Sequence, residues 1–387
     1  KGFANIVLVV VIVILLGAVG YFVFVKKSEQ IPQQPNNQMQ QSMPTPTPAP
    51  SLTLVTQAPK ISELDVLSKL DISLLERLAR GVTPDTNGAV GRNKKEYFHV
   101  RFQLGLSSIV AYGLIKRDPA IVDRGVMAME YAFRYQNADG TFHFIIPEDL
   151  KSQIPSDPQV VETTQASGVA FFYSDLGRAL LLMRESQWFE TSKDTTNLRS
   201  RVEKLRSGIV YSLTKLAEQA PLLEKADSRD TNRLFFDAAA YYLVGSWLSD
   251  QKAVELGLDF LNKALAKQRA DGVFIEKGGY DSSYQLVSLG RFFFIYLHLQ
   301  PQEEHLRVQL WEALSKGLAW ESTRVLPTGE ISTEGNTRVY PSGEQFLGKE
   351  KGLDSKGAIV GFRYYEAMTG DTSYNQLVDK ISEYYNK

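Results

Sequence analysis

The chain has 387 residues, of which 43% are hydrophobic, and this suffices for one large domain together with an anchor and a linker. Its 43 basic and 44 acidic side chains give a net charge of -1, so no excess of positive charge favours a nucleic-acid partner. Cysteine is absent and the four histidines lack the H-E-x-x-H spacing, so we expect no disulfide, no zinc site and no cofactor.

An uncharged, mostly aliphatic run occupies residues 6–25. As a helix, twenty such residues span about 30 Å, which is the thickness of the hydrocarbon core of a bilayer. We therefore predict a single transmembrane anchor over residues 1–27. Lys26 and Lys27 follow the run, and by the positive-inside rule they favour a cytoplasmic domain.

A linker is predicted over residues 28–60. No residue from 30 to 59 is charged, and proline and glutamine dominate. Such a segment cannot bury a core and acts as a disordered spacer. Because a spacer that holds a domain away from a membrane suits the cell surface, we expect a single-pass membrane protein with its domain on the extracytoplasmic side.

Residues 61–387 are predicted to be almost entirely helical, with helices in pairs separated by short breaks at Gly, Pro and Asp. The first helix of a pair is apolar almost all round, as in 166–183, 235–248, 286–299 and 357–368. The second is amphipathic, because its apolar residues recur at helical intervals. This alternation predicts an all-α fold, an incomplete α/α toroid of five to six hairpins with an inner ring of buried helices and an outer ring facing water.

A repeated sequence supports the hairpin count. The frame Q-x-A-D-G-x-F occurs at residues 136–142 and 268–274, and P-T-G-E-I at 327–331 is a looser third copy. Each copy is predicted to end an outer helix and to begin the return to an inner one. The return loops should therefore lie on one face of the ring.

The return loops and the starts of the inner helices carry most of the groups able to do chemistry. The densest stretch is residues 271–289, D-G-V-F-I-E-K-G-G-Y-D-S-S-Y-Q-L-V-S-L. The candidate site residues are Tyr284, Lys277, Glu276, Asp281 and His143 for catalysis, and Asn232, Arg233, Gln285, Asp230, Glu334, Asn336, Arg338 and Gln165 for substrate binding.

Residues 271–285, preceded some forty residues earlier by T-N-R at 231–233, resemble the catalytic region of the chondroitin and hyaluronate lyases. That family shows T-G-A-N-R and then D-G-S-F-x-Q-H followed by Y-x-G-x-Y-G, on an incomplete α/α toroid. The matching positions are Asp271, Gly272 and Phe274 in the turn, Asn232 and Arg233 in the N-R pair, and Tyr284 at the second tyrosine. The chain departs from the family at the catalytic histidine, where it has Lys277.

The resemblance implies β-elimination from a uronate-containing polysaccharide, on which a base removes the proton next to the uronate carboxylate. Its partners would be a polysaccharide or cell-surface glycan and, through the anchor, the membrane. By the resemblance, the roles fall to Tyr284 as base and then acid, Lys277 or Arg233 as the group that lowers its pKa, Asn232, Gln285 and Arg338 as ligands of the carboxylate, and His143 as a replacement for the missing histidine.

The residues leave two other classes of function open. A glycoside hydrolase needs two carboxylates on opposite sides of one bond, which Glu276, Asp281, Asp230 and Glu334 could supply. A toroid that binds or scaffolds glycans without catalysis is the second alternative. Asp281 also has a purely structural interpretation, as the N-cap of the helix that begins at Ser282.

Overall fold

The computed structural model describes residues 57–387, except 96, 154–155, 347–348 and 386–387. The chain divides after Pro46 into two units, and all described residues lie in the second. The predicted anchor over 1–27 and nearly all of the predicted linker lie outside the described residues. Within the described part, none of the helices combines the length and the apolar character that crossing a bilayer requires.

The described part of the chain is mostly helical, as predicted. Its helices are α2 (Glu63–Lys69), α3 (Ile72–Arg80), α4 (Leu106–Lys116), α5 (Pro119–Phe133), α6 (Pro158–Glu185), α7 (Gln187–Thr191), α8 (Thr196–Glu218), α9 (Ala220–Asp227), α10 (Thr231–Leu248), α11 (Gln251–Leu265), α12 (Ser282–Leu297), α13 (Arg307–Ser322), α14 (Ser355–Thr369) and α15 (Asn375–Tyr385). Two antiparallel two-residue strands, β1 (Gln345–Phe346) and β2 (Lys349–Glu350), precede α14.

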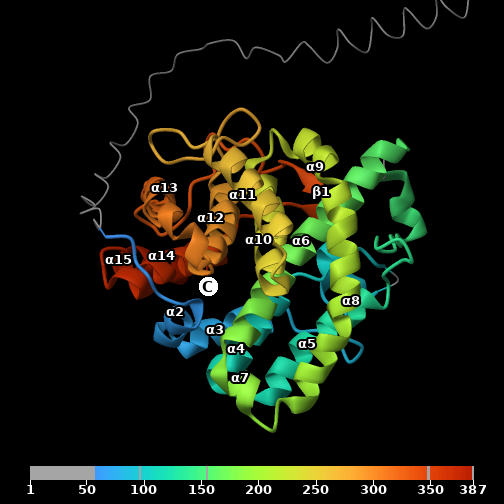
Figure 1. Ribbon diagram of the computed structural model, residues 1–387. Helices are drawn as coiled ribbons and strands as arrows, with labels where there is room; N and C mark the ends of the chain where they lie inside the picture. Colours follow the sequence, from blue (N-terminus) through green and yellow to red (C-terminus); the bar gives the residue numbers. More distant parts are fainter. Residues whose placement is uncertain (1–56, 96, 154–155, 347–348, 386–387) are drawn as a thin grey trace, which may run out of the picture. The chain divides into compact units, whose positions relative to one another are not determined.

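The buried helices pack side by side in chain order. α4 packs on α6, α6 on α10, α10 on α12, and α12 on α14, while α2 packs on both α14 and α4. Figure 1 shows the blue α2 close to the red α14. Four amphipathic or partly exposed helices back the series, with α5 on α4, α11 on α10, α13 on α12 and α15 on α14. The predicted helix pairs are present as α4–α5, α10–α11, α12–α13 and α14–α15, whereas the short α7 separates α6 from α8, and residues 220–227 form a further helix, α9.

The three copies of the repeat adopt one turn geometry. Isolated bridges join Gln136 to Phe142, Gln268 to Phe274 and, in the loosest copy, Val325 to Ile331. The glycine of each copy has a positive φ, +85°, +97° and +90°, and a Cβ there would collide with a carbonyl of the next outer helix, α8, α13 or α15. Glycine is therefore required both by the turn and by the approach of the helix. Each copy follows an outer helix, as predicted.

A buried ion-pair network ties the first helix to the rest. The Glu63 carboxylate, at the start of α2, accepts hydrogen bonds from Arg178 Nε of α6 at 2.8 Å and from the Tyr364 hydroxyl of α14 at 2.9 Å. Its other oxygen lies 2.9 Å from His298 Nε2, at the end of α12. Just before α2, the Pro59 carbonyl accepts a hydrogen bond of 2.7 Å from Tyr296, so the last residues of the predicted linker pack on the domain.

Candidate functional site

Arg338, in the loop between α13 and α14, is the centre of a buried polar cluster and is only 2% exposed. Its Nη1 donates a short hydrogen bond to Glu276 and further ones to Asp230 at 3.1 Å and Asn232 at 3.2 Å. Its Nε and Nη2 donate to Glu344 at 2.6 and 3.1 Å. The guanidinium is therefore committed to groups of the protein, in contrast to the substrate-binding role expected for it.

Asp281 fixes the same loop to the start of α12. Its Oδ1 accepts a hydrogen bond of 3.1 Å from the backbone N–H of Tyr284, and its Oδ2 accepts 2.8 Å bonds from the N–H groups of Arg338 and Val339. The structural alternative for Asp281, as N-cap of α12, matches this geometry. Because three backbone donors occupy it, we assign Asp281 a positioning role.

Gln285 and Asn336 are also engaged by the backbone. The Gln285 side chain accepts from Phe274 N–H at 2.9 Å and donates to the carbonyls of Gly272 and Gly317 at 3.2 Å, which holds the D-G turn against α13. Asn336 accepts a 3.0 Å hydrogen bond from the N–H of the first residue of α12. Both side chains are buried and bind protein where substrate contacts were expected.

Tyr284 lies directly beneath this cluster. The Arg338 guanidinium carbon is 3.9 Å from the centre of the tyrosine ring, and Lys351 Nζ is 5.4 Å from it. Burial raises the pKa of Tyr284 by more than the charge of Arg338 lowers it. The net shift is opposite to the expectation that Lys277 or Arg233 would lower this pKa, because burial of the phenol outweighs the nearby charges.

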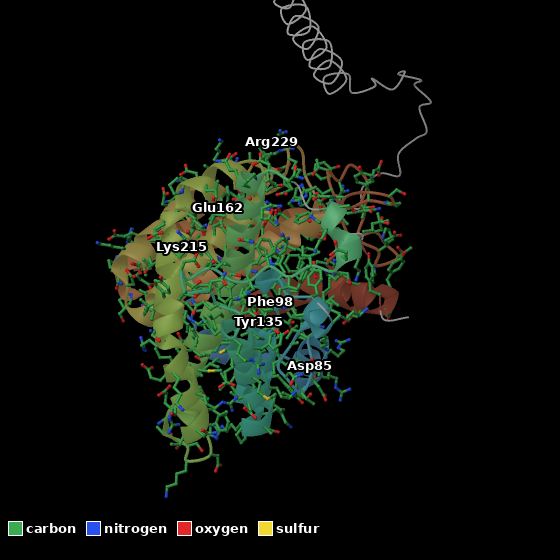
Figure 2. The ribbon with its side chains drawn as sticks, turned by 90° about the vertical axis from the view of Figure 1, so that its right-hand side faces the viewer. Asp85, Phe98, Tyr135, Glu162, Lys215 and Arg229 are labelled. Atoms are coloured by element: carbon green, nitrogen blue, oxygen red, sulfur yellow. The ribbon has the colours of Figure 1, made fainter. Side chains whose placement is uncertain are left out.

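Lys277 and Arg233 face other carboxylates. Lys277 has a positive φ of +50°, and its half-exposed Nζ lies 3.3 Å from Glu344 and 3.8 Å from Asp230. Its backbone N–H donates to the carbonyl of Arg229 in the turn after α9, labelled in Figure 2. Arg233 pairs with Asp227 at 2.9 Å.

Three predicted residues lie apart from the cluster. His143 and Gln165 line a small separate cavity bounded by α6 and α8. The His143 ring is exposed and meets Tyr135 edge-on at 6.2 Å, and Tyr135 stacks on Phe98 with 4.1 Å between ring centres (Figure 2). The Glu334 side chain is exposed. His143 therefore does not occupy the place of the missing histidine beside Tyr284.

Two adjoining spaces open beside Tyr284. A central cavity of about 370 Å³ is lined by α2, α3, α4, α6, α10, α12 and α14. A cleft of about 330 Å³ lies between residues 92–104 and 349–354, and both spaces are lined by Phe171, Tyr284, Val287 and Asp354. The charged residues along the cleft are Arg92, Arg101, Lys349 and Lys351 against Glu350 and Asp354. The cleft therefore favours an anionic ligand.

Lys351 and Glu344 complete the cluster, although neither was predicted as a site residue. Lys351 Nζ lies 2.8 Å from Glu344, and burial together with repulsion from Arg338 lowers its pKa to about 8. Burial, with Asp230 nearby, raises the pKa of Glu276 to about 7. Glu344 and Lys351 lie in the loop between α13 and α14, outside the repeat, and no local sequence pattern marks them as site residues.

Among the described residues, no three or more His, Asp or Glu side chains gather in a way that could hold a metal ion. Comparison with models of protein families, with curated proteins and with solved structures finds no match to this chain.

Proposed function

We propose that residues 61–387 form an α/α toroid that binds a uronate-containing glycan in the cleft beside Tyr284 and cleaves it by β-elimination. The packing order of the buried helices, with α2 between α14 and α4, supports the toroid. The four basic residues along the cleft support an anionic polymer as ligand. The membrane anchor over 1–27 and the extracytoplasmic location belong to the same proposal and rest on the sequence.

The observation that carries the chemistry is the position of Tyr284 beside Lys351, with their pKa values shifted in opposite directions. Burial keeps the phenol protonated, while the pKa of Lys351, about 8, leaves a neutral fraction at physiological pH. Two neighbouring groups shifted in this way suit an acid and a base. In the lyases that the sequence resembles, the tyrosine is both the base and the acid, whereas here the two roles are divided.

The elimination divides between these two side chains. The neutral amine of Lys351 takes the proton from the carbon next to the uronate carboxylate, and the electron pair of that C–H bond forms a C=C bond as the glycosidic C–O bond breaks. The Tyr284 hydroxyl gives its proton to the departing oxygen. Arg101, which lines the cleft with Tyr284, is the group proposed to neutralise the uronate carboxylate. Arg338, expected in that role, binds carboxylates of the protein.

The test is incubation of the purified protein with a panel of uronate polymers, following both the absorbance of unsaturated products and the release of reducing ends. Tyr284→Phe should reduce formation of unsaturated product by about 10²–10⁴-fold with folding unchanged. Tyr280→Phe is the matched control, since its hydroxyl donates to the Glu334 carbonyl at 3.1 Å and Tyr280 is not among the residues that line the cleft. Full activity of Tyr284→Phe would refute the assignment.

Binding without catalysis is the second candidate, favoured by the commitment of Arg338 and by Lys277 at the position of the family's histidine. Saturable glycan binding without either product, unaffected by Tyr284→Phe, would select it.

The hydrolase alternative has less support. Asp230 and Glu276 bind the same guanidinium, so they do not face each other across the cleft. Reducing ends without unsaturated product would nevertheless select a hydrolase.

A further inference from the structure

Arg291 of α12 lies on the wall of the central cavity and has an unusual environment. Within the described part of the chain its guanidinium forms no ion pair, and its buried Nε has no hydrogen-bond partner. The guanidinium carbon lies 4.5 Å from the ring centre of Phe236 and 5.3 Å from that of Phe294. The partly buried guanidinium stacks on aromatic rings, and the carboxylates of Asp175 and Asp354 favour its charge, so the hydration that it loses is replaced in part.

Arg178, on the same cavity, shows the contrast. Its guanidinium donates to Glu63 at 2.8 Å, Ser107 at 2.9 Å and Tyr364 at 2.9 Å. All of these partners are buried, so Arg178 is satisfied within the protein. Arg291 is the cavity arginine that still has donor capacity for a ligand, and burial lowers its pKa without removing its charge at neutral pH.

The remaining walls of the cavity decide what kind of anion fits. Leu67, Leu75 and Leu78 of α2 and α3 line it, together with further phenylalanine and valine side chains of α12 and α14. The carboxylate of Asp354 also lines it, but its Oδ1 accepts a 2.9 Å hydrogen bond from Gly357 N–H at the start of α14. Ser108, Asn232, Tyr284 and Lys356 also line the cavity, but the aliphatic and aromatic side chains outnumber the polar ones. An alkyl chain would therefore bury apolar surface there.

We propose that the central cavity is a second ligand site, which takes an amphipathic carboxylate with its alkyl chain against α2 and α3 and its head group on Arg291. This function goes beyond glycan cleavage and does not depend on it. One guanidinium with free donors matches one carboxylate, and charge-assisted bonds of this kind are among the strong ones in proteins.

The probes are decanoate, below its micelle concentration, and decanol, which has the same chain without the charge. Calorimetric titration of the full chain should show that decanoate binds at least tenfold more tightly than decanol, and that acetate does not bind. Arg291→Met should abolish the preference while leaving the affinity for decanol unchanged. Retained binding of decanol then shows that the cavity of the variant is intact.

Exposed Arg124→Met, on α5, is the matched control and should keep the full preference. Arg291→Lys keeps the charge, so it should retain most of the preference, and it decides the matter if the methionine variant does not fold. The proposal is overturned if the wild type binds neither probe, binds both equally, or if Arg291→Met still prefers decanoate. No glycan enters this experiment, so its result is independent of the lyase proposal.

Discussion

Two buried arginines organise two regions of the domain, and their surroundings differ in one respect. Arg178 and Arg338 are each at most 5% exposed, and each binds glutamate. The partners of Arg178 are on α2, α4 and α14 and are themselves buried. The partners of Arg338 are mostly on loops, and one of them, Glu344, is 29% exposed and borders the cleft through Lys351. An arginine–glutamate pair thus joins α2 to α6 in one region and holds loops together in the other.

The balance of charge explains why the two glutamates titrate in opposite directions. Burial disfavours ionisation of Glu63, but Arg178 and His298 together lower its pKa to about 2. Glu276 is also buried, and it shares Arg338 with two other carboxylates, so its pKa rises to about 7. An acid with two cations of its own stays ionised, whereas an acid that shares one cation is easily protonated. Near neutral pH, the protonation of the Arg338 cluster can therefore change at Glu276, whereas Glu63 stays ionised.

The largest expected effect is that of Arg178→Met. The substitution leaves the Glu63 carboxylate buried beside His298 alone, and removal of one partner of a buried pair costs about 3–5 kcal/mol of the free energy of unfolding. Urea denaturation measures the loss. Arg80→Met is the control, because its pair with Glu76 is exposed and is worth less than about 1 kcal/mol. A cost for Arg178→Met as small as that of the control would show that the buried pair with Glu63 does not stabilise the domain.

The next effect is a pH dependence that His298 should impose on stability. Burial favours the neutral ring, but Glu185 and Glu63, each 2.9 Å away, raise the pKa of His298 from 6.5 to about 9. Because the pKa is higher in the folded state, the protonated His298 ring stabilises the folded protein fully below pH 6.5. This stabilisation is lost as the pH rises through 9. The free energy of unfolding should fall over this window by on the order of 3 kcal/mol.

The measurement is urea denaturation of wild type, His298→Gln and His305→Gln at several pH values. The difference between wild type and His298→Gln should shrink as the pH rises from 6.5 to 9. The exposed His305→Gln variant should follow the wild type throughout. An equal difference at both ends of the window would show that the ring is neutral in the folded protein.

Arg338→Met should cost less than Arg178→Met, about 2 kcal/mol at pH 7. Removal of Arg338 leaves Glu276 without its cation, and this glutamate can take up a proton because burial already raises its pKa. The penalty should therefore diminish as the pH falls from 7 to 5, since a neutral carboxyl no longer needs the guanidinium. Denaturation at both pH values tests this, and a penalty that grows on acidification would contradict it.

The alternation of buried and amphipathic helices could be predicted from the sequence because it depends on local periodicity. The D-G turns were predictable for a similar reason, and even the loose copy at 327–331 has the geometry of the others. Glu63 and Arg178 are 115 residues apart in the sequence, and no local sequence pattern predicts their contact. This long-range contact between α2 and α6 therefore could not be predicted from periodicity.

The site was predictable in its location but only partly in its chemistry. From the sequence, the return loops and helix starts that carry the candidate site residues were predicted to share one face. In the structure, Arg338 hydrogen-bonds to Asp230, Asn232 and Glu276. His143 follows the first copy of the repeat and Glu276 follows the second, and the two copies belong to different helix pairs, so His143 lies in a cavity apart from the Arg338 cluster. The direction of the Tyr284 pKa shift also depends on burial, which charge counting along the chain does not measure.

Lys277→Ala should have the smallest effect, about 0–1 kcal/mol on stability. Its side chain is 40% exposed, and its contacts with Glu344 and Asp230 are long and screened by water and salt. Lys277→Asn is the control for the backbone, because asparagine tolerates the positive φ of this position better than alanine does. If denaturation showed a loss above about 2 kcal/mol for both variants, Lys277 would be a necessary counter-charge, and the neutrality of the Arg338 cluster would depend on a side chain at the surface.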